Sequence, residues 1–325
     1  MSIATAAAPR SWTETDPADW PPYLLSVADL PRVTLDATLD LAAAMKRDAL
    51  PWRHALAGQT LACFFDPPTT GMTVATGTAA DWLGMLPLVL PRDELGLGQE
   101  ETVEDMARAL STTASVLFAH TVSHRALRRI AAGATVPLVN GLSDQHRPCQ
   151  AIADLLTLRE PFGSLEGLVL AYVGDAHDGT VHSLLEAGAI AGMDVRVACP
   201  DDCRPSRLVE LGARILARMH DGRVTVTDDV EGAVRGADAV YTHAWDVDGR
   251  DDELKRYQVG PNVMRLARSR AVFMHCLPAQ RGKEVHRQIF DGRHSVVWQQ
   301  AANRVPAEQA VLYSLATAAL ARGGG

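Results

Sequence analysis

The sequence lacks the features that would place it in a membrane or on a nucleic acid. It contains no run of about 18 apolar residues, and its opening stretch has neither the basic head nor the apolar core of a signal peptide. Basic residues are in the minority, with 31 Lys and Arg against 39 Asp and Glu, which gives a formal net charge of −8. This is the wrong sign for a general binder of nucleic acid or anionic membranes, so we expect neither partner.

Cysteines are few and odd in number, which argues against a disulfide framework and for a reducing, cytoplasmic location. Cys199 and Cys203 form a C-x3-C pair, but no second pair of Cys or His lies nearby at zinc spacing. We therefore favour packing cysteines over a metal site at this pair.

Standard cofactor motifs are also missing, including the Walker motif, the G-x-S-x-G elbow and H-E-x-x-H. The segment GDAHDG (174–179) follows a predicted strand and opens a helix, as a dinucleotide-binding loop would, but it is not G-x-G-x-x-G. A tight strand-to-helix turn explains this segment at least as well.

An alternation of short β-rich runs and longer amphipathic runs is present from about residue 58 onward. This pattern is typical of an α/β fold with mostly parallel sheets, and a helix over 148–160 is expected to bridge two such series. We predict two domains, each with a central parallel sheet flanked by helices. The expected strands cover residues 61–66, 86–91, 115–122, 136–142, 167–173, 194–199, 224–228, 237–243, 271–277 and 295–298, and the expected helices include 70–83, 103–114, 124–132 and a final one after Pro306.

Three segments place reactive side chains at strand or helix ends. FFDPPTTGMT (64–73) leads into a helix that Thr69 or Thr70 would cap, which suits either a phosphate cradle or a capped helix without a ligand. HRPCQ (146–150) offers an Arg for an oxyanion and a Gln for an amide, or ordinary solvated cap residues. HCLPAQRGKEV (275–285) delivers His275 and Cys276 to the carboxyl edge of a sheet, where open α/β sheets bind ligands.

The order of these segments resembles that of the aspartate and ornithine carbamoyltransferase superfamily, most closely its ornithine branch. The resemblance rests on HCLPA-x-RG-x-EV, on NGLSDQHRPCQAIADLLTL, on ETVEDMARALS and on the late pair Asn303–Arg304, and it covers roughly residues 58–320. It implies a carbamoyl phosphate domain over 23–150 with the helix 306–322, an amino-acid domain over 151–305, and a loose arm over 1–22. It also implies trimers, or multiples of three, and no cofactor or metal.

The donor-binding motif departs from the family pattern. Family members have S-T-R-T-R where this chain has Thr69, Thr70, Gly71, Met72 and Thr73, so both arginines of the phosphate clamp are absent. His120 stands where a further donor-binding Arg is expected, and Arg147 aligns with the usual H-P-x-Q histidine. Since each charged hydrogen bond is worth about 1.5–3 kcal/mol, this loss could weaken donor binding by several powers of ten unless Arg147 compensates.

The acceptor-binding motif departs as well. HAWDVDG (243–249) stands where the family has Asp-x-x-x-Ser-Met-Gly, so His243 replaces the acid, and Val247 and Asp248 replace Ser and Met. His275 and Cys276 match the ornithine branch, in which the cysteine lies against the acceptor and the backbone near Leu277 meets the carbamoyl group. Retention of HCLP merely as a strand-end turn is the alternative.

We therefore predict a carbamoyltransferase that uses small-molecule substrates, a phosphorylated donor and an amine acceptor other than ornithine. A member with a different donor and a noncatalytic binding or assembly member are the alternatives. The resemblance and the residue chemistry assign catalytic roles to Cys276, His275, Arg304 and Gln150, donor or phosphate binding to Thr69, Thr70, Thr73, Arg147 and His120, and acceptor binding to His243, Asp248 and Leu277.

Overall fold

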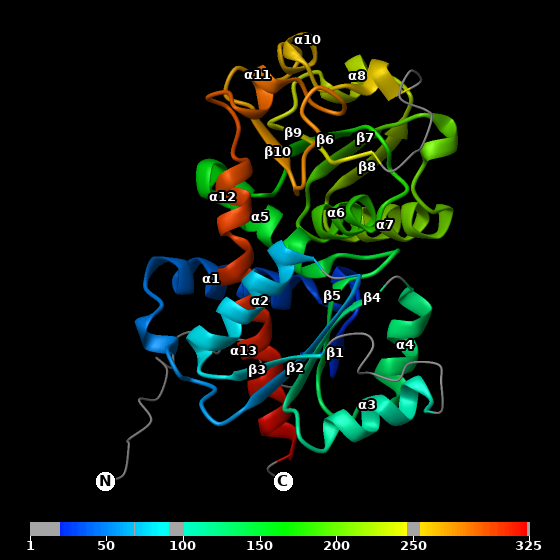
Figure 1. Ribbon diagram of the computed structural model, residues 1–325. Coiled ribbons are helices and arrows are strands. Elements are labelled where there is room, and N and C mark those ends of the chain that lie inside the picture. Colours follow the sequence, from blue (N-terminus) through cyan, green and yellow to red (C-terminus); the bar gives the residue numbers. More distant parts are fainter. Residues whose placement is uncertain (1–19, 68, 91–100, 122, 246–253, 324–325) are drawn as a thin grey trace. The chain divides into compact units, whose positions relative to one another are not determined.

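A computed structural model of the protein describes residues 20–67, 69–90, 101–121, 123–245 and 254–323. The chain folds into two compact units (Figure 1). Unit 1 comprises Met1–Ile152 and Arg304–Gly325, and unit 2 comprises Ala153–Asn303. Of the predicted arm over residues 1–22, only residues 20–22 lie in the described part.

Unit 1 is built on a five-stranded sheet in the order β1-β5-β4-β2-β3, and every pairing in it is parallel. Its strands are β1 (Tyr23–Leu24), β2 (Thr60–Asp66), β3 (Leu86–Leu90), β4 (Val116–Thr121) and β5 (Leu138–Leu142). Its helices are α1 (Arg32–Arg47), α2 (Thr70–Leu83), α3 (Val103–Ser111), α4 (His124–Gly133) and α13 (Arg304–Gly323), while α5 (Pro148–Phe162) starts in unit 1 and continues into unit 2.

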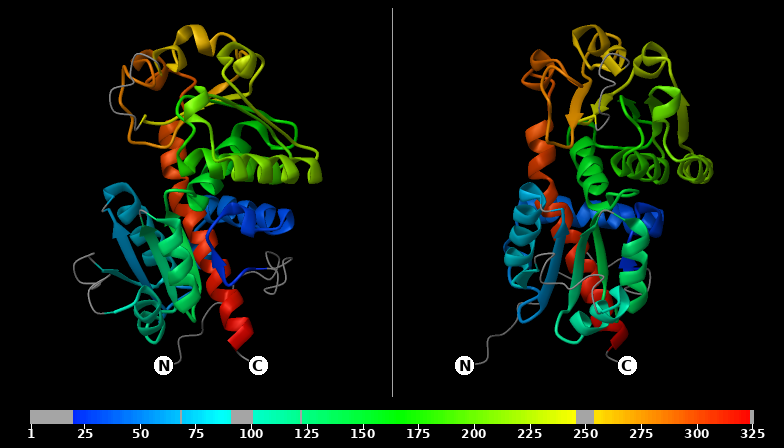
Figure 2. Two further views of the ribbon diagram at one scale, coloured as in Figure 1. Left: turned by 90° about the vertical axis from the view of Figure 1, so that its right-hand side faces the viewer. Right: turned by 45° about the vertical axis from the view of Figure 1, so that its right-hand side comes forward.

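Both faces of the unit 1 sheet are covered by helices. Because side chains alternate between the faces of a strand, Ala62 and Phe64 of β2 share one face, and they pack with Leu127 of α4 and Met106 of α3. Helix α13 packs against α1 and α2, and its red ribbon can be followed beside them in Figure 2. Two-sided cover leaves the carboxyl ends of the strands as the open edge of this unit.

Unit 2 repeats the plan with a second five-stranded parallel sheet, in the order β10-β9-β6-β7-β8. Its strands are β6 (Val169–Val173), β7 (Asp194–Ala198), β8 (Arg223–Thr227), β9 (Ala239–Thr242) and β10 (Val272–His275). Its helices include α6 (Gly179–Ile190), α7 (Arg207–Met219), α8 (Val230–Val234), α10 (Pro261–Met264), α11 (Arg287–Phe290) and α12 (Val297–Ala302), and a 3-10 turn, η6, covers Asp201–Cys203.

The predicted fold class, two α/β domains with a parallel sheet in each, is confirmed. The strand predicted over 295–298 is wrong, because Val297 begins helix α12. Val297 and Gln300 are both buried, and residues three apart share a face in a helix but point to opposite faces in a strand. The sequence reasoning also missed α1, although Leu35, Leu39 and Ala42 repeat at helical spacing and are fully buried.

All five cysteines are buried and none is in a disulfide. Within the part of the chain that the structure describes, no helix has both the length and the apolar character that crossing a membrane requires.

Candidate functional site

The first turn of α2 forms one side of the candidate site in unit 1. Thr69 precedes this helix with an extended backbone, but its side chain makes no capping hydrogen bond to the turn. Its hydroxyl instead lies 3.3 Å from Nδ1 of His120. The Thr73 hydroxyl donates to the Thr69 carbonyl over 2.9 Å, so its proton is used within the helix. The helix therefore begins without a side-chain cap from Thr69, next to the edge where anions bind in such folds.

His120 is a neutral imidazole at neutral pH. It lies near the end of β4 and is 3% exposed. Burial and the nearby positive charge of Arg147 lower its pKa to about 4, and the carboxylate of Asp66 opposes the shift only in part. In place of the arginine that the family pattern expects, this position supplies a hydrogen-bonding group without charge.

Arg304 supplies positive charge beside the same turn. It is the first residue of α13, and its Nε donates to Oε1 of Gln150 over 2.8 Å. Its NH1 atom lies 3.6 Å from where a Cβ at Gly71 would be. The guanidinium group thus lies beside the position at which the family pattern has the first clamp arginine.

Arg147 stands directly before α5, and its neighbour His146 belongs to the supporting framework. The His146 ring packs edge-on against that of His124, with 5.0 Å between ring centroids. The carbonyl of His146 accepts from the amide of Asn140 over 3.1 Å, and its N–H donates to Ser143 Oγ over 3.1 Å. These bonds hold the loop that presents Arg147, which is half-buried and close enough to His120 to shift its pKa.

In unit 2, His275 fixes the turn that follows β10. The N–H of Leu277 donates to His275 Nδ1 over 3.0 Å, and Nε2 lies 3.2 Å from Oε1 of Glu284. Nδ1 therefore accepts, and the ring proton lies on Nε2, where it points to the carboxylate. Burial is the main cause that lowers the pKa of His275, so the neutral ring is favoured. Both ring nitrogens thus make hydrogen bonds within the turn. His275 is therefore a residue that positions Cys276 and Leu277.

Leu277 has a left-handed backbone, with φ at 53°, which is uncommon for a residue other than glycine. Two hydrogen bonds hold this conformation. The N–H of Leu277 donates to His275, and the N–H of Gln280 donates to Glu284 Oε1 over 2.6 Å. Backbone in such regions persists where its surroundings enforce it, often at ligand sites. The HCLP turn is therefore a rigid, specifically shaped element.

Cys276 lies beside a buried polar network. The Tyr241 hydroxyl donates to Asp154 Oδ2 over 3.0 Å, and the amide of Gln300 donates to Asp154 Oδ1 over 2.7 Å. Burial first, and then Asp154 and Cys276, raise the pKa of Tyr241 well above its usual range. The side chains of β9, α5 and α12 thus fix the surroundings of the cysteine.

His243 follows β9 and pairs with an acid that the sequence reasoning did not single out. Its Nε2 lies 3.3 Å from Oδ1 of Asp178, and its Nδ1 lies 3.3 Å from the Tyr172 hydroxyl. His243 is 4% exposed. A carboxylate is therefore present at this edge of the sheet, supplied by the start of α6 rather than by the end of β9.

The loop after β6 is close-packed next to this pair. Gly174 has φ at +133°, and a Cβ there would come within 2.6 Å of Nε1 of Trp245. Only glycine fits such a position, so the glycine-rich segment 174–179 is explained by a tight turn. Two signals in the sequence could have pointed to these partners of His243. Asp178 is one of the two acids in this glycine-rich segment, and Tyr172 lies in the buried strand before it.

The structure brings the predicted site residues together in two groups. Unit 1 gathers His120, Arg147 and Thr69 around the start of α2, with Gly71 next to Arg304 and Gln150. Unit 2 places His243 and the HCLP turn after neighbouring strands of one sheet edge. The predicted acceptor residue Asp248 lies outside the described residues.

Comparisons with known proteins show the family to which this chain belongs. The family model described as aspartate/ornithine carbamoyltransferase, carbamoyl-P binding domain, matches residues 23–160, and the one for the Asp/Orn binding domain matches residues 166–315. Over 300 residues the chain is 37% identical to the ornithine carbamoyltransferase of Listeria monocytogenes, covering 90% of this chain and 95% of that protein. It is 40% identical over 300 residues to that of Methanothermobacter thermautotrophicus, covering 90% and 98%.

Solved structures give the same result. The ornithine carbamoyltransferase from Pyrococcus furiosus superimposes with a TM-score of 0.86 at 36% identity, and the match covers 90% of this chain and 96% of that one. The fold and the two family models thus place the chain in the class of two-domain carbamoyltransferases. The chain belongs to the aspartate/ornithine carbamoyltransferase family, on its ornithine branch.

Proposed function

We propose that this protein transfers the carbamoyl group of carbamoyl phosphate to the amine of an amino acid or related amine, and that ornithine is not its preferred acceptor. The observation that carries the proposal is the pair His243–Asp178 at the carboxyl edge of the unit 2 sheet. It presents an imidazole where the family pattern has a carboxylate, and it moves the carboxylate to the start of α6. An acceptor's ammonium and carboxylate groups would meet a different arrangement of charges.

On the donor side, unit 1 offers a reduced but usable set of groups for a phosphate dianion. The first-turn amides of α2 and the hydroxyls of Thr69 and Thr70 are neutral donors, and Arg147 and Arg304 supply the positive charge. Arg304 lies next to Gly71, the position at which the family pattern has a clamp arginine. This placement supports the hypothesis that Arg304 supplies the missing charge. Gln150, fixed by Arg304, is placed to hydrogen-bond an amide.

The proposed reaction needs no redox partner. The neutral amine of the acceptor attacks the carbamoyl carbon, a new C–N bond forms, and the C–O bond to phosphate breaks as inorganic phosphate leaves. The amine loses one proton, which leaves with phosphate or to solvent. The protein contributes by orienting both substrates and by stabilising the negative charge on the tetrahedral intermediate, the role proposed for Arg304.

Ornithine itself is the second candidate acceptor, because relatives that are 36–40% identical bear the name ornithine carbamoyltransferase. The match to these relatives covers 90% of this chain, which supports ornithine as the alternative acceptor. The difference between the two candidates lies in the few residues around His243.

A panel of acceptors tests the proposal. Wild type is assayed with carbamoyl phosphate and with ornithine, the diamine that lacks its α-carboxylate, and its homologue one methylene longer. We expect wild type to turn over an acceptor other than ornithine. In His243→Asp we expect kcat/KM for ornithine to rise tenfold or more, which corresponds to the free energy of about one charged hydrogen bond. Citrulline formation by wild type at rates ordinary for enzymes, about 1–10³ per second, would overturn the acceptor assignment. Absence of phosphate release with every amine would overturn transfer itself.

A further inference from the structure

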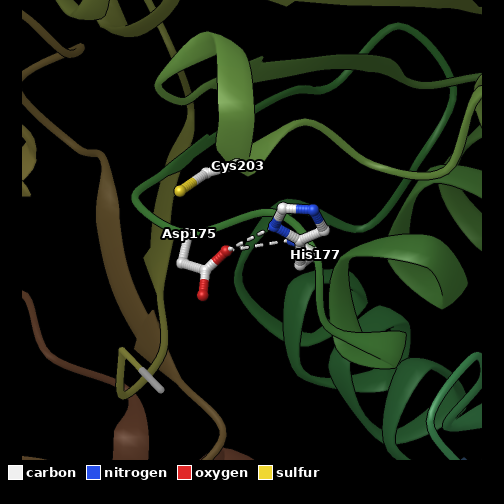
Figure 3. Close-up of side chains that lie close together, drawn as sticks. All are labelled: Asp175, His177 and Cys203. Atoms are coloured by element: carbon white, nitrogen blue, oxygen red, sulfur yellow. Dashed lines mark hydrogen bonds and ion pairs between the residues drawn. The ribbon is translucent and has the colours of Figure 1, made fainter. Parts of the chain in front are cut away.

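Three side chains of different chemistry converge in unit 2, in the loops that follow β6 and β7 (Figure 3). They are Asp175, His177 and Cys203, and one ligand atom of each lies within 4.8 Å of the other two. Oδ1 of Asp175 lies 3.6 Å from Nδ1 of His177. Asp175 and Cys203 are 4% and 0% exposed, whereas His177 is open to solvent. The group therefore has a buried base and an accessible side.

The backbone holds these side chains in register. The N–H of Ala176 donates to the Cys203 carbonyl over 3.0 Å and so joins the loop after β6 to the 3-10 turn η6. The N–H of His177 donates to Oδ1 of Asp175 over 3.1 Å, and the Tyr172 hydroxyl donates to the Asp175 carbonyl. Two segments that are far apart in sequence are thus fixed against each other before any ligand binds, which is the preorganisation that a metal site needs.

We propose that Asp175, His177 and Cys203 bind a zinc ion. A thiolate, an imidazole and a carboxylate are the three ligand types that zinc accepts, at about 2.0–2.3 Å, and three protein ligands leave one coordination position open. The thiolate disfavours Mg²⁺ and Ca²⁺, which prefer oxygen ligands. In a tetrahedral zinc site the ligand atoms lie roughly 3.3–3.8 Å apart, so the three side chains, whose ligand atoms now lie within 4.8 Å of one another, would draw closer together when the ion binds.

The zinc ion would support the neighbouring pair of residues. The loop that carries Asp175 and His177 continues into Asp178, which caps α6 and whose Oδ1 lies 3.3 Å from His243. A metal that clamps this loop to η6 would restrict the position of that carboxylate. Binding itself depends only on the three ligands, so it is independent of which acceptor the protein uses.

Zinc titration of the untagged, chelator-treated protein tests the site, with a chromophoric chelator as competitor. We expect one zinc ion per chain, held by the triad, with the release of about one proton as the Cys203 thiol becomes a thiolate. Co²⁺ in place of zinc should show thiolate charge-transfer absorption. Failure of wild type to bind zinc at micromolar free concentration, or binding without thiolate absorption, would overturn the proposal.

Matched variants identify the ligands. His177→Gln changes an exposed side chain and should leave the fold intact, and Cys203→Ser removes the thiolate. Each variant should weaken zinc binding by about 10–100-fold or more. This is the loss of metal affinity seen when a residue that hydrogen-bonds to a metal ligand is removed, and the loss of a ligand itself should be at least as large. The controls His220→Gln and Cys199→Ser change another histidine and the other cysteine of the C-x3-C pair, and they should bind as wild type does. Unchanged affinity in His177→Gln, or equal loss in Cys199→Ser, would contradict this ligand set.

Discussion

Arg147 and His120 are two neighbouring residues at which the donor-binding chemistry of this protein departs from the family pattern. The charge of Arg147 lies close enough to depress the pKa of His120, and both lie near Thr69 at the start of α2. If Arg147 compensates for the missing clamp arginines, Arg147→Ala should weaken carbamoyl phosphate binding by about 1.5–3 kcal/mol, tenfold or more, with little change in Tm. Calorimetric titration measures the affinity.

A second readout separates a binding role from a surface role for Arg147. Burial, the larger cause of the low pKa of His120, remains in the variant, so removal of the Arg147 charge should raise this pKa only part of the way from about 4, which NMR titration of the ring detects. The exposed Arg128 on α4 provides the control, since Arg128→Ala should change neither quantity. Equal heats and affinities for wild type and Arg147→Ala would dispose of the compensation hypothesis.

At the scale of the element, α13 combines Arg304 with a buried acid one turn later. Burial raises the pKa of Glu308 to about 7, against the opposing charge of Arg304. The folded state therefore favours the protonated carboxyl, whereas the unfolded chain releases this proton above about pH 4.5. The stabilisation from Glu308 is complete below pH 4.5 and is lost as the pH rises towards 7, by roughly 3 kcal/mol in the limit.

Glu308→Gln should remove this part of the pH dependence. We expect the Tm of wild type to fall relative to that of the variant between pH 4.5 and 7.5, as measured by differential scanning calorimetry. Asp81→Asn, at an exposed position on α2, is the matched control and should follow wild type. Parallel Tm curves for wild type and Glu308→Gln would show that the carboxyl is not held protonated.

At the scale of the whole molecule, the family resemblance leads us to propose a trimer or a multiple of three. A trimer of 34.9 kDa chains has a mass of about 105 kDa. The edge strand β3 exposes Leu86, Leu88 and Val89, and such an edge is normally covered in a soluble protein. Sedimentation equilibrium at micromolar concentration provides the test, and a stable monomer would contradict the proposal.

The sequence by itself determined the fold class and most of its elements, because hydrophobic periodicity is a local property. The predicted helix over 70–83 has the observed bounds, and the strand predicted over 194–199 ends one residue earlier, at Ala198. The order of HRPCQ and HCLP along the chain also identified the family. By contrast, Val297 and Trp298 favour a strand by composition, yet the segment is a helix, in which Gln300 makes buried hydrogen bonds with Asp154 and His275.

Tertiary structure decided what each site residue does, because long-range contacts set protonation and orientation. The sequence around His275 does not show that its two ring nitrogens bond to the N–H of Leu277 and to the carboxylate of Glu284. The sequence showed that an acid was missing at position 243, but only the pairing of β6 with β9 brings Asp178, in the loop after β6, to His243. The same holds for Cys203, which sequence spacing paired with Cys199 and the fold places beside Asp175 and His177, since the carboxyl ends of parallel strands gather side chains that are distant in the chain.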